Sequence, residues 1–373
     1  MKHILLSLLI LPLALAAQVQ VQVQVESLPE PGIQPQVIVT STGLVHLVYL
    51  KGDSKACDIR YASRRADGGA WSAPITVNSE PRSAIAAGTI RGAQVALGKD
   101  GSVQVIWNGN TGGKKDMMMR APLLHARLPS GAKAFSAQQN LIGDTTALDG
   151  GASIAANEKG HVSVVWHAAP AGASGEAQRL VYVRSSTDDG GTFSAPTPLN
   201  EQQPGVCACC SLRAHLAADG TLSVLYRAAT APTTRGMWFI TSKASRSTLT
   251  KLDDWRVAMC PMSSASLLPA AQTLRAAWEN DGQIITSLMS APSSEAQKIG
   301  PRNAKHPVLA QNAQGRTIIA SVIGSGWGKA GNLHWDVLDA EGHVTASGDG
   351  TKLPVSSYAA AYAKPDGSFV ILR

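Results

Sequence analysis

The stretch Gln36-Val-Ile-Val-Thr-Ser-Thr-Gly43-Leu-Val-His-Leu-Val-Tyr49 places a glycine between two apolar runs, and the second run ends in an aromatic residue. A turn residue between two runs rich in β-branched residues is a strong signal for a β-hairpin. The pattern recurs along the chain. Close copies are Ala93 to Trp107, Ala152 to Trp166 and Arg213 to Tyr226, and looser copies are Ser264 to Trp278, Pro307 to Ser321 and Ala359 to Arg373. The hairpin unit therefore occurs seven times.

Six further pairs of strands separate these hairpins, for example Asp58 to Ser63 followed by Ser72 to Val77. A hairpin and a pair together make a four-stranded unit, and no segment shows the period of an α-helix. Four-stranded antiparallel sheets repeated around an axis are the architecture of a β-propeller. The sequence therefore predicts an all-β propeller of six to seven blades, and the number of hairpins favours seven.

The N-terminal run Gln18 to Val25 alternates glutamine with valine and has no partner nearby in the sequence. We expect it to pair outside the C-terminal hairpin 359–373, which would close the ring and tie the two ends of the chain together. The alternative is a frayed tail of low complexity.

Residues 1–17 have the pattern of an export signal, because Lys2 precedes an apolar run that ends in small residues. We expect cleavage near Ala16 or Ala17, a single propeller domain over residues 18–373, and a secreted or periplasmic location. No later stretch approaches the roughly 18 apolar residues of a membrane span. The formal net charge is +7, but the basic residues are scattered, which argues against a nucleic acid or a membrane surface as the partner.

One turn between outer strands has a distinctive sequence, Ser186-Thr-Asp188-Asp-Gly190-Gly-Thr192-Phe193. The Asp and hydroxyl side chains can bind the backbone of the turn, the glycines can take positive φ, and the aromatic ring can hold the turn against its blade. We therefore assign a structural role to Ser186, Asp188, Gly190, Thr192 and Phe193. A partial copy of the motif runs from Arg64 to Pro74.

With this motif the chain resembles the sialidase superfamily of Asp-box, or BNR-repeat, propellers over nearly its whole length after the signal. The resemblance implies a propeller that holds a glycan or another small polar ligand at the mouth of its channel. In that family the first blade carries an arginine for the sialic acid carboxylate, but Gly32-Ile-Gln-Pro-Gln36 contains none. Cys210-Ser-Leu212 stands where the family has a glutamate. Exo-sialidase activity is therefore not expected.

The same resemblance matches three further positions. Arg227 corresponds to the arginine that ends the family's fourth hairpin, and Tyr358 to the nucleophilic tyrosine before its last hairpin. Asp53 or Asp58 stands loosely in the place of the family's acid/base aspartate.

The repeats predict two rings of equivalent residues around the channel. Directly after the aromatic residue of each hairpin stand Leu50, Asn108, His167, Arg227, Glu279 and Val322, and nine residues before each turn stand Gln34, Gly92, Gly151, Ser211, Ser263, His306 and Tyr358. The polar members offer both donors and acceptors. We take Asn108, His167, Arg227 and His306 as candidate ligand-binding residues, with Glu279 as general acid and Tyr358 as nucleophile if a glycoside is hydrolysed. The alternative is that these ring residues bind no ligand and are polar only because the blade edges are exposed to water.

Four cysteines precede two neighbouring hairpins, as Cys207-Ala-Cys209-Cys210 and Cys260-Pro261, and some sialidase-like bacterial proteins carry a similar pair of motifs. In an oxidising compartment we expect disulfides, most easily between Cys260 and one of the other three. A copper or zinc site is the alternative, made by Cys207, Cys209, Cys210, Cys260 and Met262, with further ligands from Met259, His215 or Met117 to Met119. Otherwise no cofactor is expected. Cys57 is predicted to be a buried free thiol.

Three functions remain open from the sequence. The first is an exported propeller that binds or hydrolyses a glycoside. The second is a scaffold without enzymatic activity that binds a protein partner, and the third is a metal or redox protein that uses the cysteine cluster.

Overall fold

The computed structural model describes residues 21–86, 88, 90–110, 121–146, 148–201, 204–270, 273–290 and 295–373. The predicted export signal, residues 1–17, and the run Met117 to Met119 lie outside these residues.

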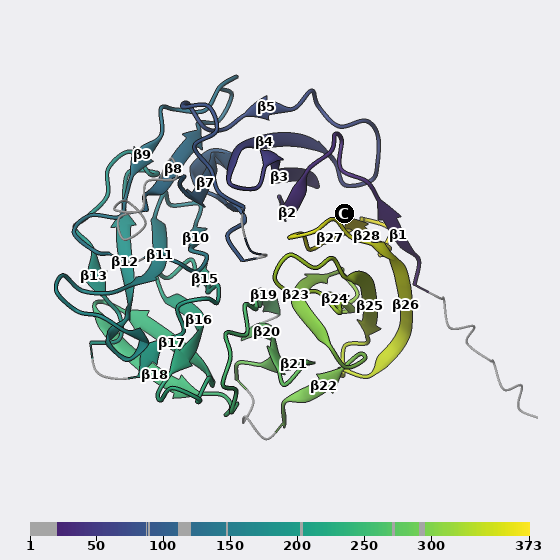
Figure 1. The fold of residues 1–373 in the computed structure, drawn as a ribbon. Coiled ribbons are helices and arrows are strands. Elements are labelled where there is room, and N and C mark those ends of the chain that lie inside the picture. Colours follow the sequence, from purple (N-terminus) through teal and green to yellow (C-terminus); the bar gives the residue numbers. More distant parts are fainter. Residues whose placement is uncertain are drawn as a thin grey trace, which may run out of the picture.

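The described residues form seven β-sheets, which stand as blades around a central channel (Figure 1). Blade 1 contains β2 (Ile33–Val39), β3 (Leu44–Asp53), β4 (Ala56–Arg65) and β5 (Ile75–Thr76). Blade 2 contains β6 (Gln94–Leu97), β7 (Val103–Asn108), β8 (Leu123–Leu128) and β9 (Gln139–Asn140). Blade 3 contains β10 (Ser153–Ala156), β11 (Val162–Ala168), β12 (Leu180–Ser186) and β13 (Thr197–Pro198).

The remaining blades follow the same plan, with one addition in blade 4. Blade 4 contains β14 (Gly205–Val206), β15 (Arg213–Leu216), β16 (Leu222–Ala229), β17 (Met237–Lys243) and β18 (Arg246–Lys251). Blade 5 contains β19 (Ser266–Ala270), β20 (Thr273–Asn280), β21 (Gln283–Leu288) and β22 (Gln297–Ile299). Blade 6 contains β23 (Ala304–Gln311), β24 (Thr317–Ile323), β25 (Asn332–Leu338) and β26 (Val344–Lys352).

Blade 7 joins the two ends of the chain. It contains β27 (Ala360–Ala363), β28 (Phe369–Leu372) and β1 (Val23–Glu26), and β1 pairs with β28 in parallel. The backbone N–H of Phe369 donates to Gln22, and that of Arg373 donates to Glu26. The predicted closure of the ring by the N-terminal strand is thus confirmed, as are the all-β propeller and its seven blades.

The hairpin turns form where the sequence places glycine between two runs. Gly43, Gly101, Gly160 and Gly220 all have φ between 78° and 85°, a region that side chains with a Cβ rarely adopt. Each of these turns joins the innermost strand of a blade to its neighbour, so the turns lie at one end of the channel. We call this the turn end, and the opposite end, where the innermost strands begin, the start end.

The core lies between the faces of adjacent blades. The aromatic residues that close the repeated hairpins are buried there, with at most 1% of their surface exposed: Tyr49, Trp107, Trp166, Tyr226 and Trp278. Val48 and Trp107, for example, belong to one cluster between blades 1 and 2. The repeated aromatic residue is therefore an inter-blade wedge, and this packing holds the innermost strands around the channel.

Candidate functional site

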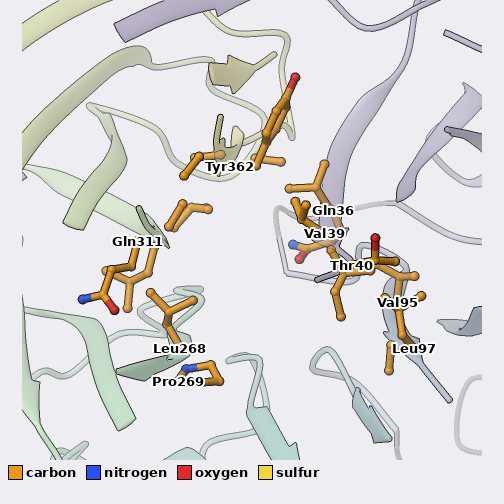
Figure 2. A pocket seen from close by; sticks show the side chains of 18 of the residues that line it. Gln36, Val39, Thr40, Val95, Leu97, Leu268, Pro269, Gln311 and Tyr362 are labelled. Carbon is orange, nitrogen blue, oxygen red and sulfur yellow. The ribbon is translucent and has the colours of Figure 1, made fainter. Parts of the chain in front are cut away.

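The channel contains a cavity of about 920 Å³ lined by the innermost strands of all seven blades. It extends to the turn end, where Gly43 and Pro365 belong to its wall. Figure 2 shows side chains from several blades around this space, among them Gln36, Val95, Leu268, Gln311 and Tyr362. The wall combines aliphatic side chains with many polar and charged ones, and pockets for small molecules use such polar groups to orient the ligand.

The charged side chains of the cavity wall are all basic. None of the described residues that line it is an aspartate or a glutamate, whereas Arg65, Arg213 and Lys364 all belong to the wall. Arg65 lies 3.9 Å from Asp67 and Lys364 lies 3.6 Å from Asp366, both near the turn end. Arg213 has no such partner among the described carboxylates. The cavity therefore offers cationic groups without acidic groups.

Arg213 is the first residue of β15, and sequence reasoning did not single it out. The side chains of its neighbours Leu212, Ala214 and Leu216 pack in the core cluster between blades 3 and 4. Because side chains alternate between the two faces of a strand, Arg213 lies on the opposite face. Its guanidinium Nη1 donates to the carbonyl of Leu212 at 2.9 Å. Burial lowers the pKa of Arg213. The signal that could have revealed it is an arginine between two apolar residues, Leu212 and Ala214, at the start of a strand.

His215 shares the wall with Arg213, because the two residues lie on the same face of β15. Burial lowers the pKa of His215, so this side chain is held neutral. His215 was a further candidate metal ligand from its sequence position, but the close cluster of described cysteines does not include it.

Polar residues also close the start end of the channel. Tyr358 is buried, and its Oη accepts a hydrogen bond from Gln36 Nε2 at 3.3 Å. The ring of His306 lies 6.1 Å from that of Tyr358, and His306 Nδ1 contacts Ser264 Oγ at 3.2 Å. Burial holds the pKa of His306 at about 3 and raises that of Tyr358. Neither residue lines the cavity, and His306 is neutral.

Gln34 and His306 mark irregular starts of two innermost strands. Both have positive φ, 54° and 55°, and each lies at a register shift in its strand. The side-chain amide of Gln34 donates to the carbonyls of Ala86, Gly88 and Ser356. This glutamine therefore joins blade 1 to the loops of blades 2 and 7 across the start end.

The predicted ring after each aromatic residue forms contacts between neighbouring blades. Asn108 Nδ2 donates to the carbonyl of Gly150 at 3.0 Å, and His167 Nε2 donates to that of Cys210 at 3.0 Å. Arg227 donates through Nη2 to the carbonyl of Glu279 at 2.6 Å, and its guanidinium lies over Trp255. Each side chain thus binds the loop or strand of the next blade. These three side chains are buried, so they are not the solvated blade-edge polarity that was the alternative; they bind the next blade instead.

Glu279 is the buried carboxylate of this ring. Only 2% of its surface is exposed, and its Oε1 lies 3.9 Å from Lys305 Nζ. Burial raises the pKa of Glu279, against the opposing charges of Lys305 and Arg227. Glu279 and Tyr358 are both buried outside the cavity wall, so the structure does not bring the two candidate catalytic residues together around the cavity.

Two glycines of the second ring, Gly92 and Gly151, and the neighbouring Gly150 allow loops to approach closely. A Cβ on Gly92 would lie 2.1 Å from Tyr358 Oη, and a Cβ on Gly150 would lie 2.2 Å from both the Cys210 carbonyl and His167 Nε2. A Cβ on Gly151 would lie 1.9 Å from the carbonyl of Ile90. These glycines are therefore needed for packing over the start end of the channel.

The cysteine cluster lies where the innermost strand of blade 4 is interrupted. Both β14 and β15 pair with β16, and the residues between them leave the sheet. Cys209 is bonded to Cys260, in the loop before blade 5, which confirms the predicted bridge between Cys260 and one of the other three. Cys207 and Cys210 are buried free thiols in this structure, and so is Cys57, as predicted.

The two buried thiols of the cluster contact each other. Cys207 Sγ lies 3.6 Å from Cys210 Sγ and also 3.6 Å from Cys209 Sγ. Burial raises the pKa of Cys210, but the hydrogen bond from Cys207 and the charge of Arg227 outweigh it and lower this pKa to about 7. The sulfurs of Cys207, Cys209 and Cys210 lie within 4.8 Å of one another, so a soft metal could use all three only after the bridge to Cys260 is reduced.

The distinctive turn of blade 3 has the predicted internal contacts. Asp188 accepts hydrogen bonds from Ser186 Oγ at 2.7 Å and from Thr192 Oγ1 at 2.7 Å, and Ser186 Oγ accepts one from the N–H of Gly190 at 2.9 Å. Phe193 packs edge-on against His125 of blade 2, with ring centres 5.1 Å apart. These contacts hold the turn against the neighbouring blade.

Comparisons with known proteins describe the fold. No protein-family model matches the sequence, and no curated protein sequence matches it. Among solved structures, a protein of unknown function from Dyadobacter fermentans is similar with a TM-score of 0.54 at 15% identity, over 89% of this chain and 98% of that one. The GH93 α-L-arabinofuranosidase of Fusarium graminearum, solved with arabinobiose, has a TM-score of 0.55 at 10% identity, over 83% and 93%.

A Hadza microbial sialidase is similar as well, with a TM-score of 0.51 at 13% identity over 83% of this chain and 69% of that one. The fold is therefore shared with sialidase-like and arabinanase-like propellers. Within the described residues, no helix has the length and apolar character to cross a membrane.

Proposed function

We propose that this chain is a carbohydrate-binding propeller that holds an anionic sugar in its central channel. The observation that carries the proposal is the cavity of about 920 Å³, whose charged wall residues are all basic. Pockets for small ligands commonly have volumes of about 300–1,000 Å³, so the cavity has room for a sugar unit. A sugar carboxylate would supply the negative charge that the wall lacks.

Arg213 is the residue we assign to the carboxylate. It is half-buried on the cavity wall, and no ion pair joins it to a described carboxylate. A guanidinium can bind a carboxylate through two parallel hydrogen bonds. The amides of Gln36 and Gln311 belong to the same wall and can bind sugar hydroxyls.

Binding without hydrolysis is the better-supported form of this function. Hydrolysis of a glycoside commonly needs two carboxyl groups that flank the bond, and the described wall of the cavity contains no carboxylate. Glu279 and Tyr358 remain the candidate catalytic residues, but both are buried in contacts between blades. The fold shared with glycosidase-like propellers supports the ligand class.

The test uses a glycan array with matched pairs of oligosaccharides, each pair differing only in a carboxylated or a carboxyl-reduced sugar. The best acidic ligand is then titrated by calorimetry against Arg213→Gln. Because hydrogen bonds to a charged group contribute about 1.5–3 kcal/mol, we expect the affinity to fall at least about tenfold. The control is Arg246→Gln, on the exposed outer strand of the same blade, which should bind like the unchanged protein.

Equal binding of the acidic and reduced sugars, or an unchanged affinity in Arg213→Gln, would refute the proposal. Release of monosaccharide from the bound glycan would instead show that the protein hydrolyses its ligand, and would direct attention back to Glu279 and Tyr358.

Export and the other candidate functions remain predictions. A ligand of this kind is consistent with the predicted export signal, residues 1–17, and with a single propeller over residues 18–373. The scaffold that binds a protein partner is still the alternative, and mass spectrometry of material captured from the exported fraction would distinguish the two.

A further inference from the structure

We propose that Cys207, Cys209, Cys210 and Cys260 form a thiol–disulfide relay that moves two electrons between a buried dithiol and the surface of the protein. The relay is independent of sugar binding. It rests on the order of the four sulfurs, from the interior outward.

The four cysteines differ in exposure along this line. Cys207 and Cys210 are at most 2% exposed and carry the free thiols. Cys209 is 7% exposed and is bonded to Cys260, which is an exposed residue. The disulfide therefore spans the distance between the buried thiols and solvent. A thiol next to a disulfide can exchange with it if the sulfurs come into contact.

The contacts between sulfurs allow two successive exchanges. In the first, the thiolate of Cys207 attacks Cys209 Sγ, 3.6 Å away; a Cys207–Cys209 bond forms, the Cys209–Cys260 bond breaks, and Cys260 leaves as a thiolate with the electron pair. In the second, the thiolate of Cys210 attacks Cys207 Sγ, also 3.6 Å away, and Cys209 leaves as a thiolate.

The balance of these two steps needs no outside oxidant. The buried pair has become a Cys207–Cys210 disulfide, and its two protons have passed to Cys209 and Cys260. The exposed Cys260 can then attack an external disulfide and release one thiol, after which Cys209 attacks Cys260, releases the second thiol and restores the first bridge. The substrate class is therefore a small-molecule or protein disulfide, which is reduced to two thiols.

A hydrogen bond joins the two buried thiols, because Cys207 Sγ donates to Cys210 Sγ at 3.6 Å. This hydrogen bond and burial raise the pKa of Cys207, so Cys207 passes its proton to Cys210 as it attacks Cys209, since the thiolate is the nucleophile. The backbone N–H of Cys207 donates to the carbonyl of Arg227 at 3.0 Å, which anchors the segment that carries both thiols to β16.

A second cavity, of about 160 Å³, gives an external disulfide access to the bridge. Cys209 and Cys260 both line it, together with Met262, Trp327, Ile90, Arg91 and Asp149. Trp327 is 69% exposed, so its ring forms an apolar wall at the surface. A bridge that only joined two loops would need no such space beside its sulfurs.

The test compares two variants that cannot form the Cys207–Cys210 bond. In Cys210→Ala, Cys207 is still beside Cys209, so the first exchange frees Cys260, and iodoacetamide should label Cys260 within the folded protein. In Cys207→Ala the attacking sulfur is absent, and we expect labelling of Cys260 to be at least tenfold slower. Peptide mass spectrometry identifies the labelled residue and the Cys207–Cys209 bridge, and circular dichroism checks that both variants are folded.

A second measurement follows the complete relay in the Cys57→Ser protein, where the fifth thiol is absent. Oxidation by 4,4′-dithiodipyridine should release two thiones per chain and leave both a Cys207–Cys210 and a Cys209–Cys260 bond. In the variant that also carries Cys209→Ala and Cys260→Ala, release should be at least tenfold slower. Equal labelling of Cys260 in the two single variants, equal rates of thione release, or a zinc or copper ion retained on the thiols would overturn the relay.

Discussion

At the scale of single residues, buried histidines decide how the propeller responds to acid. His125 is fully buried between two glutamines: its Nε2 donates to Gln104 at 2.9 Å, and its Nδ1 accepts from Gln139 at 3.0 Å. His167 likewise donates from Nε2 to Cys210 and accepts at Nδ1 from Arg179. Burial, with the charge of a neighbouring arginine, lowers the pKa of His125 to about 3 and that of His167 to about 4. Both are therefore neutral in the fold.

We predict that the free energy of unfolding falls as the pH drops from 6.5 towards 5. In that range the unfolded chain binds protons on these histidines and the folded chain does not, at a cost of up to about 1.4 kcal/mol per histidine and pH unit. His125→Gln should flatten the dependence, as measured by urea unfolding at each pH. His343→Gln is the control because its side chain is 77% exposed. An equal slope in the His125 variant and the unchanged protein would contradict the assignment.

At the scale of elements, β1 protects the edge of β28. Besides the parallel pairing of β1 with β28, three backbone hydrogen bonds join the segment Gln22 to Leu28 to residues 369–373. Arg64 donates to the Glu26 carboxylate at 2.7 Å. Val23 also packs in the cluster between blades 6 and 7. Without β1, the strand β28 would expose an unpaired edge to other chains.

A chain that begins at Leu28 lacks the β1–β28 ladder and the hydrogen bonds of Phe369 and Arg373 to Gln22 and Glu26. It should therefore be less stable than a chain that begins at Gln18, by more than about 2 kcal/mol if each lost hydrogen bond contributes about 1 kcal/mol. Chemical unfolding measures the difference, and size-exclusion chromatography detects association through the exposed edge. An excess of a peptide of residues 18–27 should restore both properties. If the shorter chain stays monomeric with an unchanged unfolding midpoint, closure by β1 does not contribute to stability.

The elements also show how far the sequence could be interpreted. The hairpins were predictable because glycine at positive φ and alternating apolar residues are local signals, as at Gly43 and Gly160. The inter-blade contacts of Asn108 and His167 were not, because a polar residue at a strand end gives no sign of which carbonyl it will meet 42 or 43 residues along the chain. Arg213 was missed for a similar reason: the role proposed for it depends on which residues of the other blades face the cavity, and none of the described wall residues is an acid.

At the scale of the whole molecule, the distribution of charge matters more than its sum. The chain carries 26 acidic residues, yet none of the described ones lines the channel cavity. A cleft of one charge sign with low-dielectric walls concentrates its field on a ligand of the opposite sign. Asp67, beside Arg65 near the turn end, is one of the acids that weaken this field.

We therefore predict that binding of an acidic oligosaccharide weakens with salt, whereas binding of its carboxyl-reduced partner does not. Between 0.1 M and 1 M salt the screening length falls from about 10 Å to about 3 Å, so we expect the affinity for the acidic sugar to fall several-fold. Arg213→Gln should reduce the salt dependence.

Asp67→Asn should tighten binding at low salt, because Arg65 then lacks its nearby carboxylate. Titration calorimetry at the two salt concentrations measures all of these effects, and an equal salt dependence for both sugars would mean that the basic wall does not select the ligand.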